Sequence, residues 1–289
     1  VYNCFFSSIR NSGCEVAESA LVRRGDSYEI DFDDFEGKCA DGKTSVYVLC
    51  NPHNPVGRVW TREELLRIHE ICHRYGVRVV ADEVHCELVM PGYRYTPFGS
   101  LSKECLHDSV TLSSPTKAFN IAGLQIANVV CADAAIRRRI DRAININEVC
   151  DVNSFGPLAL EAAYNEGADW LDELIGYLHG NYMALKEYFC EHLPEVQILR
   201  LEGTYLVWAD IRGSRLGSDE AARVLYEEGN VYVTPGTLYG KRDGEGYLRI
   251  NIACQRDKML EGLRRIAETL RGYGFYGNTG LTLDMFKDE

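Results

Sequence analysis

Four polar residues in the first half of the chain each come shortly after an apolar run typical of a buried strand. They are Asn51, Asn54, Asp82 and Lys117. In an open α/β sheet, ligands bind outside the carboxyl ends of the strands. We therefore expect these side chains to share one crevice, where a desolvated carboxylate or ammonium needs a partner of opposite charge.

Two arrangements would satisfy both charges in such a crevice. Asp82 and Lys117 could form a salt bridge with each other, or each could engage a ligand separately. Pyridoxal phosphate (PLP) suits the second arrangement, because a lysine amine forms a Schiff base with its aldehyde and a carboxylate keeps its pyridine nitrogen protonated. An amide can donate to its phenolate oxygen, and an arginine can hold the α-carboxylate of an amino acid in a two-pronged contact.

Strands and helices alternate along the first half of the sequence. The residues TREELLRIHEICHRYG have a helical apolar period, begin with a capping box at Thr61 and Glu64, and end at Gly76. Near-continuous apolar strands separated by helices predict an α/β fold with a mainly parallel central sheet flanked by helices. The predicted strands of this sheet are residues 45–50, 77–82, 109–114 and 125–131.

The second half of the sequence has a different order of predicted helices and strands. Three helical stretches follow Arg137, and the last of them, beginning at Asp169, is long enough to bridge two lobes. Strands at VQILR, GTYLVWADI, VYVTP and YLRINIA, with helices at SDEAARVLYEEG and DKMLEGLRRIAETLRGYG, predict a smaller α+β domain. We expect a large domain over residues 1–170 and a bridging helix with a small domain over residues 171–289. The final residues GNTGLTLDMFKDE carry no interpretable pattern.

Composition narrows the class of protein. The net charge of -12 disfavours a nucleic-acid or anionic-membrane surface, and no run is long enough to be a membrane span. The eleven cysteines are scattered without a C-x-x-C pair, which favours reduced thiols in the cytoplasm over disulfides or a metal centre. Seven histidines without ligand spacing argue against a structural zinc site.

Four motifs occur in a particular order: NPHNPVG, VVADEVH, SSPTKAFNIAG and YLRINIA. Together they resemble the class I/II aminotransferase family of PLP enzymes (fold type I) from Val1 to about Gly272. ADEVHCELV and KAFNIAGLQ are most similar to the branch of cystathionine β-lyases, the C–S lyases of the MalY/PatB type. The resemblance implies PLP as cofactor, a small amino acid as substrate and a homodimer.

The resemblance assigns roles to four residues with high specificity. Lys117 matches the lysine that binds PLP and moves the Cα proton, and Asp82 matches the partner of the pyridine nitrogen. Asn54 matches the donor to the phenolate oxygen, and Arg249 matches the carboxylate clamp. Asn51 is interpreted as a turn former, since Asn–Pro pairs often build turns.

Three further residues have weaker matches. His85 takes a place near the phenolate oxygen, although a core histidine bonded to a backbone carbonyl is an equal alternative. Ser114 matches a phosphate-binding hydroxyl or simply ends its strand, and Tyr2 resembles the aromatic residue that stacks on the cofactor ring. Tyr205 and Trp208 are interpreted as core residues.

Two departures from the family pattern stand out. Gln125 replaces an arginine that many members place on the phosphate. Members also have a segment before the stacking aromatic residue, with a glycine-containing turn at the phosphate. Because this sequence opens at VYNCFF, we expect a truncated gene product or a fragment.

Three functions remain open from the residues alone. A β-lyase expels a thiolate from Cβ and releases pyruvate and ammonia, whereas an aminotransferase exchanges amino groups with a 2-oxo acid. The named residues serve both reactions, so the preference for the lyase rests on resemblance. The third hypothesis is a non-catalytic remnant that folds or dimerises without holding PLP.

Overall fold

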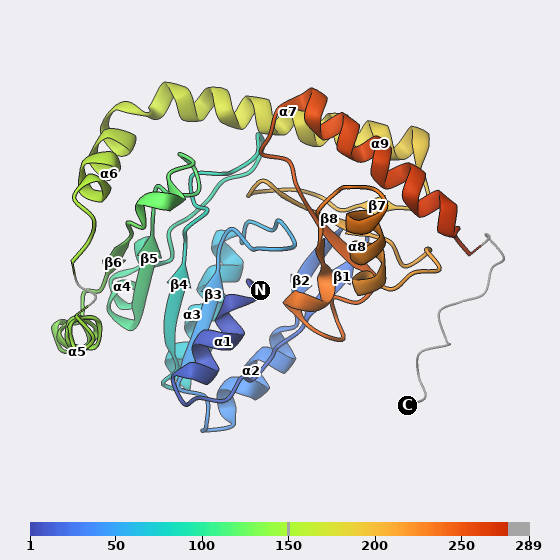
Figure 1. Ribbon diagram of the computed structural model, residues 1–289. Coiled ribbons are helices and arrows are strands. Elements are labelled where there is room, and N and C mark those ends of the chain that lie inside the picture. Colours follow the sequence, from blue (N-terminus) through green and yellow to red (C-terminus); the bar gives the residue numbers. More distant parts are fainter. Residues whose placement is uncertain (149–150, 277–289) are drawn as a thin grey trace.

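The computed structural model describes residues 1–148 and 151–276. It contains two four-stranded sheets and a separate hairpin (Figure 1). The first sheet has the order β3-β4-β5-β6, in which β3, β4 and β5 are parallel and β6 is antiparallel to β5. Its strands are β3 (Val46–Cys50), β4 (Arg78–Asp82), β5 (Ser109–Ser113) and β6 (Asn128–Val130). The predicted mainly parallel α/β sheet is therefore confirmed.

The register of this sheet brings the carboxyl ends of its strands together. Cys50 pairs with Asp82, and Asp82 pairs with Leu112. The residues that follow these three strands consequently start from one edge of the sheet, as the sequence predicted.

One face of the sheet is buried more deeply than the other. Leu49, Val79 and Ala81 are fully buried and belong to one core cluster with Leu65 and Ile68 of α3 (Arg62–Arg74). On the other face, Val48 and Val80 are only partly buried and Val46 is exposed. α3 has the predicted capping box: Thr61 Oγ1 accepts from the Glu64 backbone N–H at 3.2 Å, and the Glu64 carboxylate accepts from the Thr61 N–H at 2.7 Å.

The second sheet has the order β7-β8-β10-β9, and its pairs are antiparallel. Its strands are β7 (Gln197–Ile198), β8 (Leu206–Asp210), β9 (Thr234–Pro235) and β10 (Tyr247–Asn251). Three helices share a core cluster with it: α7 (Ala168–His192), α8 (Ser218–Glu227) and α9 (Arg256–Tyr273). The 25 residues of α7 extend for about 37 Å. In Figure 1 this helix runs along the top of the molecule from the side of the first sheet to the side of the second.

A hairpin that the sequence reading did not identify packs against the second sheet. It consists of β1 (Leu21–Arg24) and β2 (Ser27–Ile30), with Gly25 at φ 61° in the two-residue turn. Arg23 forms an ion pair with Asp210, and Trp208 Nε1 donates to Tyr28 Oη at 3.3 Å. Residues from the predicted large domain thus contact the small one, and the boundary at residue 170 stays a prediction.

The remaining helices lie around the first sheet and its connections. They are α1 (Cys4–Asn11), α2 (Phe32–Ala40), α4 (Lys103–Asp108), α5 (Ala134–Asn145) and α6 (Phe155–Glu166), with short 3-10 turns at Phe98–Ser100 and Ala122–Leu124. A third 3-10 turn, Gly236–Tyr239, contacts α8 and β10 beside the second sheet. None of the helices in residues 1–148 and 151–276 has both the length and the apolar character needed to cross a bilayer. Residues 277–289, for which no structure is predicted from the sequence, lie outside the described residues.

Candidate active site

A cavity of about 410 Å³ lies at the carboxyl ends of the parallel strands, against the second sheet. A volume of this size is ordinary for a cofactor or small-molecule site. The seven candidate residues all line it: Tyr2, Asn54, Asp82, His85, Ser114, Lys117 and Arg249. The structure therefore brings together every residue that the sequence reading selected for this site.

Lys117 is part-buried in the turn after β5, directly before the fully buried Ala118. Within the described part of the chain, its ammonium has no hydrogen bond and no carboxylate within 4.0 Å. The salt bridge with Asp82 that the sequence left open is thus not formed. A cation in a cavity without such a partner is available to a ligand.

Asp82 is the last residue of β4, and its Oδ1 accepts from the Val84 backbone N–H at 3.1 Å. Burial raises the pKa of this carboxyl above its ordinary value, while the Val84 N–H and the charge of Lys117 oppose the rise. A cationic donor that entered the cavity and bound Asp82 would therefore favour the ionised form of this carboxyl group.

His85 is almost completely buried, and its Nδ1 has no hydrogen-bond partner in the described structure. The alternative of a core histidine bonded to a backbone carbonyl through this atom is therefore not what the structure contains. Burial, followed by the charges of Lys117 and Arg249, lowers the pKa of His85 to about 4. At neutral pH the ring is a neutral imidazole, with a free nitrogen for a ligand that enters the cavity.

Asn54 and Arg249 reach the cavity from opposite sheets. Arg249 Nη1 donates to Asn54 Oδ1 at 3.0 Å, and its Nη2 lies 3.4 Å from Thr234 Oγ1. The guanidinium also lies over the Tyr239 ring, at 4.9 Å from its centroid. The side chain is thus held in place on one side, and no carboxylate of a described residue is paired with it.

The loop that carries Asn54 is held by a buried ion network. Arg58 pairs with Glu202 at 2.9 Å and with Glu64 of the α3 capping box at 2.9 Å. Asn51 Oδ1 accepts from the Trp60 backbone N–H at 3.1 Å, which agrees with its interpretation as a turn former. These contacts connect the loop to α3 and to Glu202, in the segment before β8, and hold the loop that positions Asn54.

Ser114 and Tyr2 contribute differently from the other candidates. The Ser114 hydroxyl donates to the Ile126 carbonyl oxygen at 2.6 Å and lies 2.8 Å from Thr116 Oγ1, so its proton already has acceptors within the turn. A phosphate contact from this hydroxyl stays a prediction. Tyr2 is 38% exposed, and its hydrogen bond with Cys4, followed by partial burial, raises the pKa of its phenol to about 12.

Tyr205 is a cavity residue that the sequence interpretation placed in the core. Its ring packs against the core cluster of the second sheet but also lies edge-to-face with His85, at 5.6 Å between centroids, and lines the cavity. Trp208 is buried as predicted and stacks on Tyr247. Tyr205 precedes the first residue of β8, and its contact with His85, a residue distant in the chain, is what places it in the cavity.

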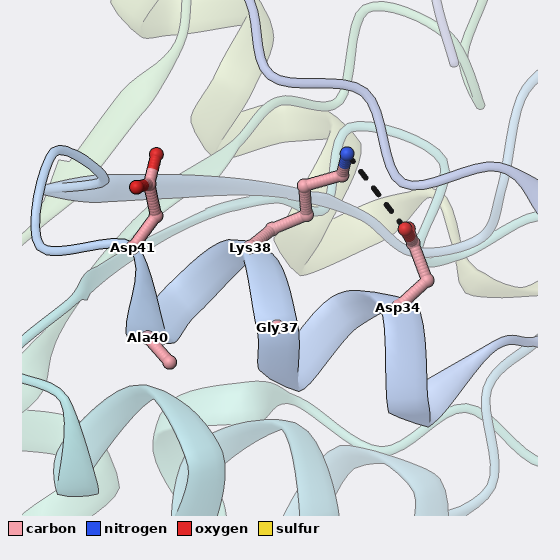
Figure 2. Close-up of a pocket in the computed structure, with 5 residues that line it drawn as sticks. All are labelled: Asp34, Gly37, Lys38, Ala40 and Asp41. Carbon is pink, nitrogen blue, oxygen red and sulfur yellow. Dashed lines mark ion pairs between the residues drawn. The ribbon is translucent and has the colours of Figure 1, made fainter.

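A second hollow, on the surface of α2, has no comparable chemistry. It is lined by one short stretch of chain: Asp34, Gly37, Lys38, Ala40 and Asp41. In Figure 2, Lys38 and Asp34 point toward each other, and their ion pair spans 3.7 Å along the helix. These groups serve each other and do not converge on a ligand.

Comparison with known proteins identifies the class to which this fold and cavity correspond. The chain belongs to the aminotransferase class I and II family, whose pattern matches residues 1–266. The resemblance read from the four motifs is thereby confirmed.

Individual relatives place the chain further within that family. It is 38% identical to cystathionine beta-lyase PatB of Bacillus subtilis over 93% of this chain and 70% of PatB. It is 30% identical to protein MalY of Escherichia coli over 93% of this chain and 68% of MalY. Among solved structures, cystalysin from Treponema denticola, which contains pyridoxal 5'-phosphate, superposes with a TM-score of 0.91 and 31% identity, covering 94% of this chain and 69% of cystalysin.

The residues in the cavity fit PLP. Among the described residues, Lys117 offers an amine without a hydrogen bond or close carboxylate, and Asp82 offers a partly buried carboxylate without a cationic donor within 4.0 Å. His85 offers a buried ring nitrogen, Nδ1, that has no partner in the part of the chain that the structure describes. An aldehyde, a protonated pyridine and a phenolate oxygen are the complementary groups for these three side chains.

Proposed function

We propose that this chain binds PLP and acts as a cysteine-S-conjugate or cystathionine β-lyase. The observation that carries the proposal is the environment of Lys117, whose amine has no hydrogen-bond or ion-pair partner within residues 1–148 and 151–276 and lies in a cavity shared with Asp82 and Arg249. The preference for C–S bond cleavage is supported by the similarity to PatB.

PLP, when bound, supplies an aldehyde for amines and a protonated ring that accepts the electron pair released at Cα. Asp82 would hold the proton on the pyridine nitrogen, and its partial burial would strengthen that contact. Asn54 would donate its amide N–H to the phenolate oxygen, since its carbonyl oxygen already accepts from Arg249. Tyr2 lies at the mouth of the site, where its ring can cover the cofactor.

Arg249, as a cation, would hold the substrate, and Lys117, as a neutral amine, would deprotonate it. Arg249 uses the part of its guanidinium that faces the cavity to bind the α-carboxylate and orient the amino acid. Lys117, once its Nζ is free of the cofactor, removes the Cα proton. Loss of the thiolate from Cβ follows, and hydrolysis of the resulting enamine gives pyruvate and ammonia.

The lyase and the aminotransferase differ in a single requirement. Incubation of the protein with PLP and L-cystathionine should release pyruvate without a 2-oxo acid acceptor. Strict dependence on such an acceptor would favour the aminotransferase instead. A chain that gains no near-ultraviolet or visible absorbance band with PLP would be the non-catalytic remnant.

A matched pair of variants tests the lysine assignment. Lys117→Ala should abolish both the absorbance band and pyruvate release. Lys43→Ala removes an exposed lysine before β3 and should leave both unchanged. Equal behaviour of the two variants would exclude the proposed role of Lys117.

A homodimer is part of the proposal. Large apolar side chains are exposed on and around α6, which supports a protein contact on this side of the molecule. These side chains are Ile146, Val152, Phe155, Leu158 and Trp170. Size-exclusion chromatography with light scattering should give twice the monomer mass, and a mass of one chain would contradict the dimer.

A cytoplasmic location is also proposed. All ten cysteines in the described residues are free thiols, which is the usual state in a reducing compartment. Titration of thiols in freshly purified protein should recover them without prior reduction.

A further inference from the structure

A cluster of metal-ligating side chains lies outside the active site, where α3 meets the end of α4. His69 and His73 come from α3, and Asp108 is the last residue of α4. Asp108 Oδ2 lies 3.3 Å from His69 Nε2 and 2.7 Å from His73 Nδ1. The three ligand atoms all lie within 4.8 Å of one another.

The fold itself fixes this arrangement. His69 and His73 are four residues apart and therefore share one face of the helix, a spacing suited to a metal that the expectation of no zinc site overlooked. His69 is buried beside Phe98, whereas His73 lies at the exposed end of α3. Arg78 Nη1 donates to the His107 carbonyl oxygen at 3.0 Å, which holds the residue before Asp108 against β4.

We propose that His69, His73 and Asp108 form a zinc site, with water in the fourth position. Zinc takes imidazole nitrogen and carboxylate oxygen at about 2.0–2.2 Å, so the ligand atoms of a tetrahedral site lie roughly 3.3–3.5 Å apart. The distance from Asp108 to His69 already has this value. The shorter distance to His73 has to open by less than about 1 Å, and the His73 side chain is 62% exposed and free to move.

The same contacts also fit a hydrogen-bonded cluster without a metal. Neutral imidazoles can donate to both oxygens of Asp108, and His107 Nδ1 lies 3.5 Å from Oδ1. Zinc would take the place of the N–H protons that His69 and His73 donate to Asp108 Oδ2, and His107 would stay beside Asp108 Oδ1. The two alternatives therefore differ in whether the preformed triad binds added metal.

The proposed site is separate from the cavity and independent of the proposed function. Asp108 directly precedes the first residue of β5, whereas Lys117 follows the last residue of that strand. Five residues of strand span about 17 Å. A metal at the triad would join α3 to the start of β5, so its role is to stabilise the large sheet, not to take part in the reaction at the opposite edge.

Zinc titration of the full chain tests the proposal. After removal of metals with EDTA, Zn²⁺ should bind with one-to-one stoichiometry and a dissociation constant in the micromolar range or tighter, measured by competition with a chromogenic indicator. His73→Ala and Asp108→Asn should each weaken binding by at least about 10-fold. His192→Ala removes an exposed histidine of α7 outside the triad and should leave the affinity unchanged.

A stability measurement makes the result independent of the binding assay. Zn²⁺ at 100 times its dissociation constant should shift the unfolding equilibrium about 100-fold toward the folded state. The shift should be absent in His73→Ala, whose exposed position leaves the fold intact. The proposal would be overturned if the wild-type chain did not bind zinc. It would also be overturned if His73→Ala and His192→Ala bound zinc equally well, because thiols elsewhere would then hold the metal.

Discussion

Replacement of Arg249 by lysine isolates the contact proposed for the substrate carboxylate. The guanidinium uses Nη1 for Asn54 and approaches Thr234 with Nη2, so its remaining N–H groups are those available to a ligand. Lysine keeps the positive charge but cannot make two parallel hydrogen bonds to a carboxylate. The variant therefore removes one charged hydrogen bond to the substrate while conserving the electrostatic attraction.

The size of the effect follows from this single lost bond. A hydrogen bond to a charged group contributes about 1.5–3 kcal/mol, and each 1.36 kcal/mol is a factor of 10. We expect kcat/KM for L-cystathionine to fall by roughly 10- to 150-fold, mainly through KM if the contact is equally strong in ground and transition states.

Steady-state pyruvate release measures the change, and PLP absorbance provides the control. The absorbance band should persist in Arg249→Lys, because the contact concerns the substrate and not the lysine that holds the cofactor. The carboxylate clamp would be refuted by an unchanged kcat/KM. Loss of the PLP band together with activity would assign Arg249 to cofactor binding instead.

Four further predictions concern the carboxylate, the buried histidine and the folded scaffold. Asp82→Asn should reduce kcat by about 100-fold or more, because a neutral amide no longer holds the ring proton; activity within a few-fold of wild type would contradict its role. His85 has a pKa of about 4 in the folded chain and an ordinary value of 6.5, so the unfolded chain binds more protons below pH 6.5 and stability is lost as the pH falls toward 4. In urea unfolding of the PLP-free protein, the free energy of unfolding should thus fall by about 2 kcal/mol between pH 7 and pH 5, and this fall should be missing in His85→Gln. An equal fall in both proteins would refute the lowered pKa of His85. Gly57→Ala should destabilise the protein by about 1–3 kcal/mol, since Gly57 has φ +74° and an added Cβ would lie 2.8 Å from Leu201 Cδ1; an unchanged melting temperature would show that the loop relaxes. Thr61→Ala removes half of the α3 capping box and should lower the free energy of unfolding by about 1 kcal/mol; an unchanged free energy in urea unfolding would contradict the contribution of this cap.

The site was largely predictable because its residues follow strands. Asp82 and Lys117 come after apolar runs whose period and composition identify them as strands of one parallel sheet, and parallel strands place their carboxyl ends together. Arg249 was predictable for a different reason, since a guanidinium in an apolar strand requires a polar partner.

Other parts of the structure depend on tertiary contacts that have no local signature. The hairpin at Leu21–Ile30 is rich in charged residues, and its arginine at position 23 is satisfied by Asp210, a distant residue in the chain. Its Gly-Asp turn was the available signal. Tyr205 was assigned to the core because its neighbours are apolar, and only the approach of His85 reveals its face toward the cavity.

The hydrogen-bonding of Ser114 likewise could not be read from spacing. Its place three residues before Lys117 matches the family pattern, yet the hydroxyl proton has the Ile126 carbonyl as an acceptor on the strand-like segment that follows. The position of a hydroxyl in a motif therefore does not determine which group it binds. A comparison of PLP affinity between wild type and Ser114→Ala bears directly on this residue.

The central claim is that the amine of Lys117 binds the PLP aldehyde covalently. Reduction of the PLP-loaded protein with borohydride, followed by proteolysis and mass spectrometry, tests it most directly. We expect a phosphopyridoxyl group on the peptide that contains Lys117 and on no other lysine peptide at stoichiometric yield. An unmodified Lys117 peptide, or a label distributed over surface lysines, would contradict the account.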